Sequence, residues 1–287
     1  MKSIVITGAN GFIGRKLCEF CQASGHQVIE LARTATGSGR SALWRLGEGL
    51  PPQFKNVDAV IHLASATLVE SRNLAEAFRR DVDGSQVLIE SVRSIRKSGR
   101  PIRFIFLSSQ SSKVNAATAY GRSKWAIETM LDQDDEIVVR PGLVYSDQPT
   151  SVFALFEKIA RLPLVPVVRT RASIQPIHVQ ELVECVARIA TMERPQRIFE
   201  LGAINPINLR QAIAASARRA GRSQPRFVPI PQGTLRLATL VFDRLFKPAP
   251  SLTERLDGLI VLSPMDTERS LDALCRKLAP FGQYPLD

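Results

Sequence analysis

The sequence predicts an α/β fold in which a doubly wound parallel sheet carries a smaller, mostly helical lobe in the C-terminal part of the chain. Three observations predict it. In the first half, short β-branched runs alternate with longer stretches of helical period, as in a parallel sheet covered on both faces. A glycine-rich turn at residues 7–14 follows the first apolar run. After Gly142 the alternation gives way to helical segments joined by proline-rich connections, which favours a lobe packed on the sheet.

The first half is expected to contain a regular series of elements. Each expected strand is a short apolar run, and each expected helix is a longer segment with a period of 3.6 residues. Gly25 follows the first helix and suits a helix C-cap. In chain order the expected strands are 4–6, 28–31, 59–63, 104–107 and 137–139, and the expected helices are 11–24, 74–95 and 118–131.

The chain after Gly142 is expected to be mostly helical. Its helical segments are separated by proline-rich connections at 162–166 and 227–231, which cannot extend a regular βαβ series. We therefore expect a sheet domain over residues 1–165 and a second lobe over residues 166–287, partly interleaved with the first. The helices expected after Gly142 are 152–161, 179–192, 208–220 and 234–246.

Composition and charge limit the class of protein. With 287 residues, 45% hydrophobic and 23% charged, the chain can bury a substantial core, and a disordered or fibrous protein is excluded. The net charge of +11 attracts anions, but the basic residues are dispersed and lack interleaved aromatics, so we expect no nucleic-acid partner. No apolar run reaches the roughly 18 residues of a membrane span, and no signal peptide precedes the first strand. We expect a cytoplasmic protein without a membrane partner.

Two of the four cysteines, Cys18 and Cys21, form a C-x-x-C pattern. A structural metal site of this type needs a second pair at a suitable distance, and the sequence has none. Their spacing of three residues within the first expected helix predicts partly buried thiols. We therefore expect no metal site.

The segment from Thr7 to Gly14, TGANGFIG, lies between the first expected strand and the first expected helix. Its three glycines allow a tight turn, close approach of the backbone to a pyrophosphate, and tight contact between helix and strand. The N-terminus of the helix adds unpaired N–H groups that attract an anion. In this context the segment predicts a dinucleotide-binding loop.

With its leading threonine, this G-x-x-G-x-x-G spacing resembles the TGxxGxxG motif of the extended and atypical short-chain dehydrogenases/reductases. Residues 62–65, HLAS, resemble the HLAA that ends the family's fourth strand, and residues 140–145, RPGLVY, resemble its RPxxVYG. The resemblance covers roughly residues 2–190 and implies NAD or NADP on a Rossmann-type sheet, with His62 and His178 as packing residues. It implies these cofactor-binding residues: Gly8, Asn10, Gly11, Phe12, Ile13, Gly14, Leu63, Ala64, Ser65, Tyr120, Lys124, Pro141 and Val144.

The choice between NAD and NADP depends on the end of the second strand, where an acidic side chain would bind a ribose and a cation would pair with a 2′-phosphate. Aligned with the family's strand, the acidic position falls on Ala32 and is followed by Arg33. This favours NADP and makes Arg33 a cofactor-binding residue. NAD stays open, because Arg33 could instead stack on an adenine or face solvent.

A Y-x-x-x-K pattern, Tyr120 to Lys124, lies in an expected helix, where a spacing of four places both side chains on one face. Tyrosine ordinarily ionises near pH 10 and is a poor base at pH 7, so a nearby ammonium that favours the phenolate is what proton transfer needs. By the family resemblance, Lys124 also binds the nicotinamide ribose and Ser109, at the end of the strand 104–107, is the catalytic hydroxyl. Ser108 is its nearest rival.

Several positions depart from the family pattern. Asp81 stands where many extended members have asparagine, and Gln110-Ser111 stand where sugar 4,6-dehydratases have an acidic pair. Without a carboxylic acid to protonate a leaving hydroxyl, loss of water is disfavoured. Trp44-Arg45-Leu46-Gly47 replace the usual Gly-Asp after the third strand and leave the adenine pocket open to question.

These observations predict an NAD(P)-dependent epimerase or reductase that transfers a hydride at a hydroxyl or ketone carbon of a small-molecule substrate, first of all a nucleotide-linked sugar. One alternative is a reductase of an apolar, steroid-like or flavonoid-like ketone, which would not need Arg169, Arg171 or Arg210 in the second lobe. A further alternative is a cofactor-binding subunit or regulator without catalysis, against which Ser109, Tyr120 and Lys124 argue. The resemblance also implies a homodimer through the helices 74–95 and 118–131.

Overall fold

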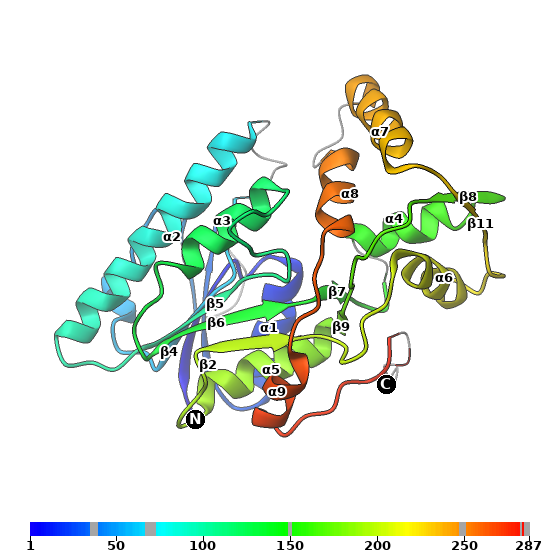
Figure 1. Cartoon of the computed structure of the whole chain (residues 1–287). Coiled ribbons are helices and arrows are strands. Elements are labelled where there is room, and N and C mark those ends of the chain that lie inside the picture. Colours follow the sequence, from blue (N-terminus) through cyan, green and yellow to red (C-terminus); the bar gives the residue numbers. More distant parts are fainter. Residues whose placement is uncertain (35–39, 67–72, 149–150, 247–250, 282, 284–287) are drawn as a thin grey trace.

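The computed structural model describes residues 1–34, 40–66, 73–148, 151–246, 251–281 and 283. Its centre is a sheet of seven parallel strands in the order β10-β6-β5-β4-β1-β2-β3 (Figure 1). The order reverses between β1 and β4, as in a doubly wound sheet, so the predicted fold class is confirmed. The strands are β1 Ser3–Thr7, β2 Gln27–Ala32, β3 Ser41–Leu43, β4 Ala59–His62, β5 Arg103–Leu107, β6 Glu136–Pro141 and β10 Ile198–Leu201.

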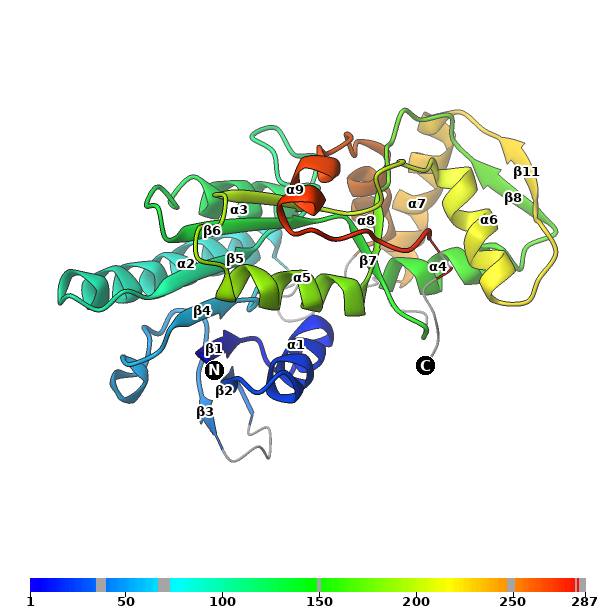
Figure 2. The same ribbon diagram turned by 90° about the horizontal axis from the view of Figure 1, so that it is seen from below.

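Helices cover both faces of the sheet. One face packs on α1 (Phe12–Ala23) and α5 (Val179–Thr191), whose buried residues share a core cluster with β1 and β6. The other face packs on α2 (Leu74–Lys97) and α3 (Ala119–Glu128). Figures 1 and 2 show these helix pairs on opposite sides of the strands. Because both faces are buried, the strands are mostly apolar runs rather than alternating ones, which is the pattern that predicted them.

The second lobe has its own core. Buried residues of α4 (Ser151–Ile159), β8 (Leu164–Val167) and α6 (Leu209–Arg219) form this cluster, together with Leu259 of α8 (Leu252–Ile260). β8 pairs with β11 (Arg226–Pro229), and β7 (Leu143–Tyr145) pairs with β9 (Pro176–His178), both in parallel. The remaining elements are η1 (Pro52–Phe54), α7 (Gln232–Phe246) and α9 (Thr267–Ala273).

The two parts of the chain are interleaved in space. After the second lobe has begun, α5 and β10 return to the seven-stranded sheet, and α9 packs beside β10. The elements β10, α8 and α9 were not predicted from the sequence. The division at residue 165 stays a prediction, because part of 166–287 belongs structurally to the sheet.

All seven strands are parallel, so their carboxyl ends lie along one edge of the sheet. Thr7, Ala32, His62 and Leu107 end β1, β2, β4 and β5 at this edge. In open α/β sheets this edge, close to the reversal of strand order, is where ligands bind. Among the described residues, no helix has both the length and the apolar character needed to cross a bilayer.

Candidate active site

The glycine loop has a conformation that requires its glycines. Gly8 has φ +71°, and a Cβ added there would lie 2.9 Å from the backbone nitrogen of Ala64. A Cβ at Gly14 would lie 2.2 Å from the carbonyl oxygen of Gly8, so the first turn of α1 packs directly on the loop. Gly11 is the N-cap of α1, with no side-chain cap and no acidic residue in the first turn. The N-terminus of α1 therefore leaves its N–H groups to an anion.

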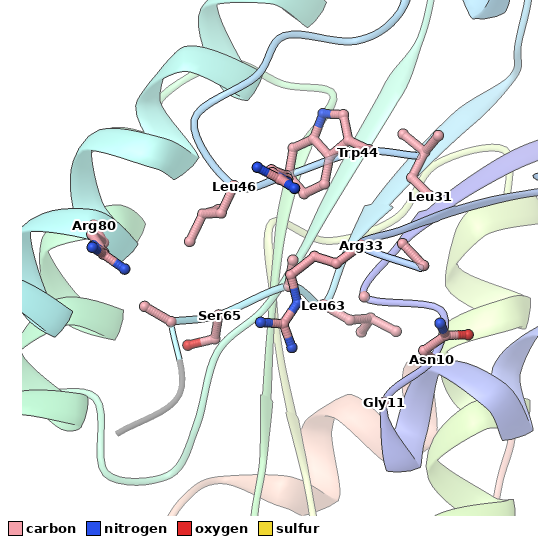
Figure 3. Close-up of a pocket in the computed structure, with 14 residues that line it drawn as sticks. Asn10, Gly11, Leu31, Arg33, Trp44, Leu46, Leu63, Ser65 and Arg80 are labelled. Atoms are coloured by element: carbon pink, nitrogen blue, oxygen red, sulfur yellow. The ribbon is translucent and has the colours of Figure 1, made fainter. Parts of the chain in front are cut away.

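A cavity of about 510 Å³ lies beside this loop (Figure 3). The predicted residues among its lining come from the loop, from the end of β2 and from the segment after β4. Seven further lining residues were not among the predicted site residues, and they come from the end of β2, from the segments after β3 and β4, and from α2. The predicted lining residues are Gly8, Asn10, Gly11, Arg33, Leu63, Ala64 and Ser65, and the added ones are Leu31, Ala32, Trp44, Arg45, Leu46, Ala66 and Arg80.

Three guanidinium groups line this cavity. Arg33 follows β2, Arg45 follows β3, and Arg80 lies on α2, where it pairs with Glu76 at 2.6 Å. The side-chain amide of Asn10 donates to the carbonyl oxygen of Thr34 at 3.1 Å and to its hydroxyl at 2.8 Å, which ties the glycine loop to the segment that carries Arg33. Three cations of this type around one cavity make a site for a multiply charged anion.

A buried hydrogen-bond chain fixes the segment after β4. The hydroxyl of Thr7 accepts from the N–H groups of Leu63 and Ala64, both at 3.2 Å, so its proton is left to donate to Nδ1 of His62 at 2.7 Å. Nε2 of His62 then carries the ring proton and donates to Ser85 at 3.0 Å. Burial, with a smaller contribution from the charge of Lys124, lowers the pKa of His62 to about 3. His62 is thus a neutral packing residue, as expected.

Asp81 connects the cofactor side of the site to α3. Its carboxylate accepts from the hydroxyl of Ser65 at 2.9 Å, from the N–H of Ala66 at 2.7 Å and from the hydroxyl of Ser123 at 3.0 Å. The carboxylate is only 2% exposed. Asp81, which stands where many members of the family have asparagine, therefore supplies a carboxylate that accepts from three donors.

Tyr120 and Lys124 lie together on α3, at the side of β5. The ammonium of Lys124 is 5.5 Å from the centre of the Tyr120 ring and 4.7 Å from the centre of the Phe106 ring. Lys124 is 2% exposed and forms no ion pair or hydrogen bond with any residue that the structure describes, whereas Tyr120 is 42% exposed. A buried ammonium thus lies beneath a phenol that solvent can reach.

Ser109 lies just beyond β5, next to the start of α3. Its hydroxyl is 3.0 Å from that of Ser111 and accepts from the N–H of Ser111 at 3.2 Å. A Cβ on Gly121 would lie 2.5 Å from the carbonyl oxygen of Ser111, so the loop that carries Ser109 packs against the residue after Tyr120. The rival Ser108 is buried and donates to Glu128. Ser109 is therefore the better-placed hydroxyl, although its role stays a prediction.

The remaining predicted site residues do not line the cavity of about 510 Å³ beside the glycine loop, which we call the large cavity. Phe12 and Ile13 begin α1, and Gly14 is buried behind the loop. The carbonyl oxygen of Pro141, at the end of β6, accepts from the N–H of Gln110 at 2.8 Å, and Val144 pairs with Ile177 across β7 and β9. Ser109, Tyr120 and Lys124 also do not line this cavity; they lie further along the same sheet edge.

Gln110 joins the sheet to the second lobe instead of supplying an acid. Its side-chain amide is buried and donates to the carbonyl oxygens of Ser173 at 2.6 Å and Ser263 at 2.9 Å. It therefore holds two distant segments beside the strand that carries Ser109. Elimination of water still lacks a proton donor at this position.

The other residues singled out in the sequence have packing roles. His178 is buried and accepts from the N–H of Gln180 at the start of α5, and its ring meets that of Tyr145 edge to face with the ring centres 5.1 Å apart. Cys18 and Cys21 are buried in the core beneath α1, and burial raises their pKa values to about 12 and about 11. They are therefore held as neutral thiols, in keeping with packed cysteines.

Comparisons with known proteins found a matching family model, related proteins and similar solved structures. The model of the NAD dependent epimerase/dehydratase family matches residues 4–202. Ceramide reductase of Caulobacter vibrioides is 29% identical over 192 residues, covering 62% of this chain and 57% of that protein. UDP-2-acetamido-2,6-beta-L-arabino-hexul-4-ose reductase of Pseudomonas aeruginosa is 28% identical over 143 residues, covering 50% of this chain and 34% of that protein. This chain thus matches little more than half of the first relative's length and about a third of the second's.

Among solved structures, UDP-N-acetylglucosamine 4-epimerase from Bacillus cereus superimposes with a TM-score of 0.63. The match covers 81% of this chain and 87% of that one at 16% identity. At this identity the likeness concerns the fold.

Proposed function

Because the chain belongs to the NAD-dependent epimerase/dehydratase family, we propose that it is an NADP(H)-dependent oxidoreductase acting at a hydroxyl or ketone carbon of its substrate. The observation that carries the proposal is the buried ammonium of Lys124, 5.5 Å from the ring of the accessible Tyr120. Both lie on the sheet edge that also carries the glycine loop. The alternative of a cofactor-binding subunit or regulator without catalysis does not explain why the protein buries the ammonium of Lys124.

The residues around the large cavity fit a dinucleotide. The glycine loop leaves no room for side chains where a pyrophosphate would approach, and the N-terminus of α1 offers N–H groups to it. Arg33, Arg45 and Arg80 suit a 2′-phosphate, which supports NADP over NAD. When bound, the dinucleotide supplies or accepts the hydride.

Three side chains take part in the proton transfer, each in a different role: Tyr120, Lys124 and Ser109. During reduction, the hydroxyl of Tyr120 donates its proton to the substrate oxygen as that oxygen gains charge; in the reverse direction the phenolate takes the proton back. The ammonium of Lys124 stabilises the phenolate and has N–H groups left for the nicotinamide ribose. Ser109 donates a hydrogen bond to the same substrate oxygen.

A nucleotide-linked sugar is the first substrate class. A second cavity of about 220 Å³, in the C-terminal lobe, is lined by Arg169 and Arg210 beside Phe227. The guanidinium of Arg210 lies 5.0 Å from the centre of the Phe227 ring. Two guanidinium groups suit a diphosphate, and an aromatic ring suits a base.

An apolar ketone is the second substrate class. One relative is named for a lipid substrate, ceramide. The second lobe of this chain also exposes an apolar face on α7, which is not expected of an enzyme that meets only water-soluble substrates.

Substitution Tyr120→Phe tests the reaction. We expect NADPH oxidation, followed by absorbance over a panel of nucleotide-linked ketosugars and long-chain ketones, to fall at least about 100-fold. NADPH affinity, measured by titration calorimetry, should stay unchanged. The panel also separates the two substrate classes. Turnover that survives the substitution would remove Tyr120 from its role, and affinity for neither NADPH nor NADH would end the proposal.

Two expectations from the sequence stay proposals. We propose a homodimer through α2 and α3, which pack side by side. We also propose a cytoplasmic location. Light scattering of the purified protein and cell fractionation test them.

A further inference from the structure

Helix α7 turns a polar stripe toward α8 and exposes most of its apolar side chains. Figure 1 shows α7 at the outer end of the second lobe, beyond α8. A helix on the surface of a globular protein normally buries its apolar stripe and exposes its polar one.

The face of α7 turned to α8 is held by polar contacts. Arg236 forms an ion pair with Asp257 at 3.4 Å. The buried hydroxyl of Thr239 accepts from that of Thr253 at 3.0 Å. The carboxylate of Asp243 accepts from two N–H groups at the start of α8, Leu252 at 2.7 Å and Thr253 at 2.9 Å. Residues 236, 239 and 243 follow the helical repeat, so this inner stripe is continuous.

The opposite face of α7 is apolar and exposed. Leu237, Val241 and Leu245, spaced four residues apart, form a line along the helix with exposed fractions of 64%, 51% and 69%. Phe242 and Phe246 flank this line, with ring centres 4.6 Å apart. We call this face the α7 apolar face; its members are Leu237, Leu240, Val241, Phe242, Leu245 and Phe246.

One exposed cation, Arg244, lies beside the α7 apolar face. Asp243 is the single acidic residue of α7, and it is turned to α8. The chain as a whole carries +11. A surface helix with aromatic and aliphatic side chains outward and a cation beside them has the composition of an interfacial membrane helix. At 15 residues, α7 is about 22 Å long, suited to lying flat in the headgroup region rather than crossing it.

We propose that the α7 apolar face docks the enzyme on an anionic lipid bilayer, with Leu237, Val241 and Leu245 entering the acyl boundary and Arg244 meeting lipid phosphates. The docking places the second lobe, which we propose to be the substrate-binding lobe, at the membrane surface. It revises our expectation from the sequence that the protein has no membrane partner. It does not depend on which substrate class is correct.

Co-sedimentation with vesicles tests this proposal. The full chain is mixed with vesicles of phosphatidylcholine alone or with phosphatidylglycerol. We expect binding to the anionic vesicles that weakens as salt is raised. The double substitution Leu237→Gln/Leu245→Gln should lower the partition coefficient at least about tenfold, because it removes two inserting side chains. Arg244→Glu should lower it severalfold on anionic vesicles only.

The matched control is Leu164→Gln/Ile204→Gln, which changes two side chains with exposed fractions of 56% and 49% outside α7. This variant should bind vesicles as the unaltered protein does, and both double variants should keep the melting temperature. Tyr120→Phe should also bind vesicles normally, which separates docking from hydride transfer.

Three results would overturn the proposal. The unaltered protein could fail to sediment with anionic vesicles at low salt, or the two double variants could bind equally. Light scattering could also show a dimer that Leu237→Gln/Leu245→Gln converts to a monomer, which would assign the face to a second copy of the chain.

Discussion

The side chain of Lys124 is buried, and burying an ammonium reduces the stability of the folded protein. Lys124 is 2% exposed, lies against the ring of Phe106, and forms no ion pair within the described part of the chain. Burying an ammonium without a carboxylate lowers the free energy of unfolding. A group held at such a cost usually serves a ligand or a reaction. We therefore regard Lys124 as the residue whose chemistry the site is built around.

Substitution Lys124→Met separates stability from activity. Methionine has a similar volume and no charge, so we expect the free energy of unfolding in urea to rise by about 1 kcal/mol. Turnover should fall at least about 100-fold, because the phenolate of Tyr120 loses its neighbouring cation. A variant that is less stable, or that keeps its turnover, would contradict this role.

Arg33 should decide the preference between cofactors. Substitution Arg33→Ala removes one of the three guanidinium groups of the large cavity, and we expect NADPH to bind about tenfold more weakly, with NADH nearly unchanged. Calorimetric titration measures both. Arg218→Ala, on the exposed side of α6, is the matched control. If the unaltered protein binds NADH more tightly than NADPH, Arg33 has no such role.

At the scale of elements, one ion cluster fastens α2 to the strand β6. Glu136 is 1% exposed, and its carboxylate accepts from Arg93 at 2.7 Å and from Arg96 at 3.0 Å. Burial alone would raise the pKa of Glu136, but the hydrogen bonds from Arg93 and from the N–H of Gln133, with the charges of Arg93 and Arg96, hold it below its usual range.

This cluster predicts a loss of stability in acid. A carboxylate whose folded pKa is depressed contributes stability above its unfolded pKa of about 4.3, and that stability is lost as the pH falls through the folded pKa. Unfolding in urea at a series of pH values should show this loss below about pH 4. Glu136→Gln should reduce that acid-dependent loss and cost about 3 kcal/mol at pH 7, because Arg96 loses its carboxylate partner and Arg93 keeps only Asp132. A pH profile identical to that of the unaltered protein would show that Glu136 does not titrate in this way.

Elements of the first half could be predicted because each carries its own local signal. The run Val28 to Leu31 is apolar except for Glu30, and the helix after the glycine loop has a clear period. β10, Ile198-Phe199-Glu200-Leu201, has the same length and the same single charge, but it lies after Gly142, where the regular alternation of strands and helices has ended, so it was not predicted. The structure supplies the reason for that charge, since Glu200 pairs with Arg140 of the neighbouring strand.

At the scale of the whole molecule, the candidate site could be predicted in part. The glycine loop and the Tyr120 to Lys124 pair are local motifs, so the sequence shows them. Arg45 and Arg80 reach the cavity from segments far apart in the chain, and the contact of Gln110 with Ser263 spans more than half of it. Such contacts depend on how the elements pack, which a single sequence does not display.

The central claim is that Tyr120 and Lys124 stand beside the nicotinamide of a dinucleotide whose phosphates rest on the glycine loop. A crystal structure of the protein with NADPH tests it most directly. We predict the pyrophosphate at the N–H groups of α1, and the nicotinamide ribose within hydrogen-bond distance of the ammonium of Lys124. A dinucleotide bound away from the glycine loop, or a nicotinamide out of reach of both side chains, would contradict the account.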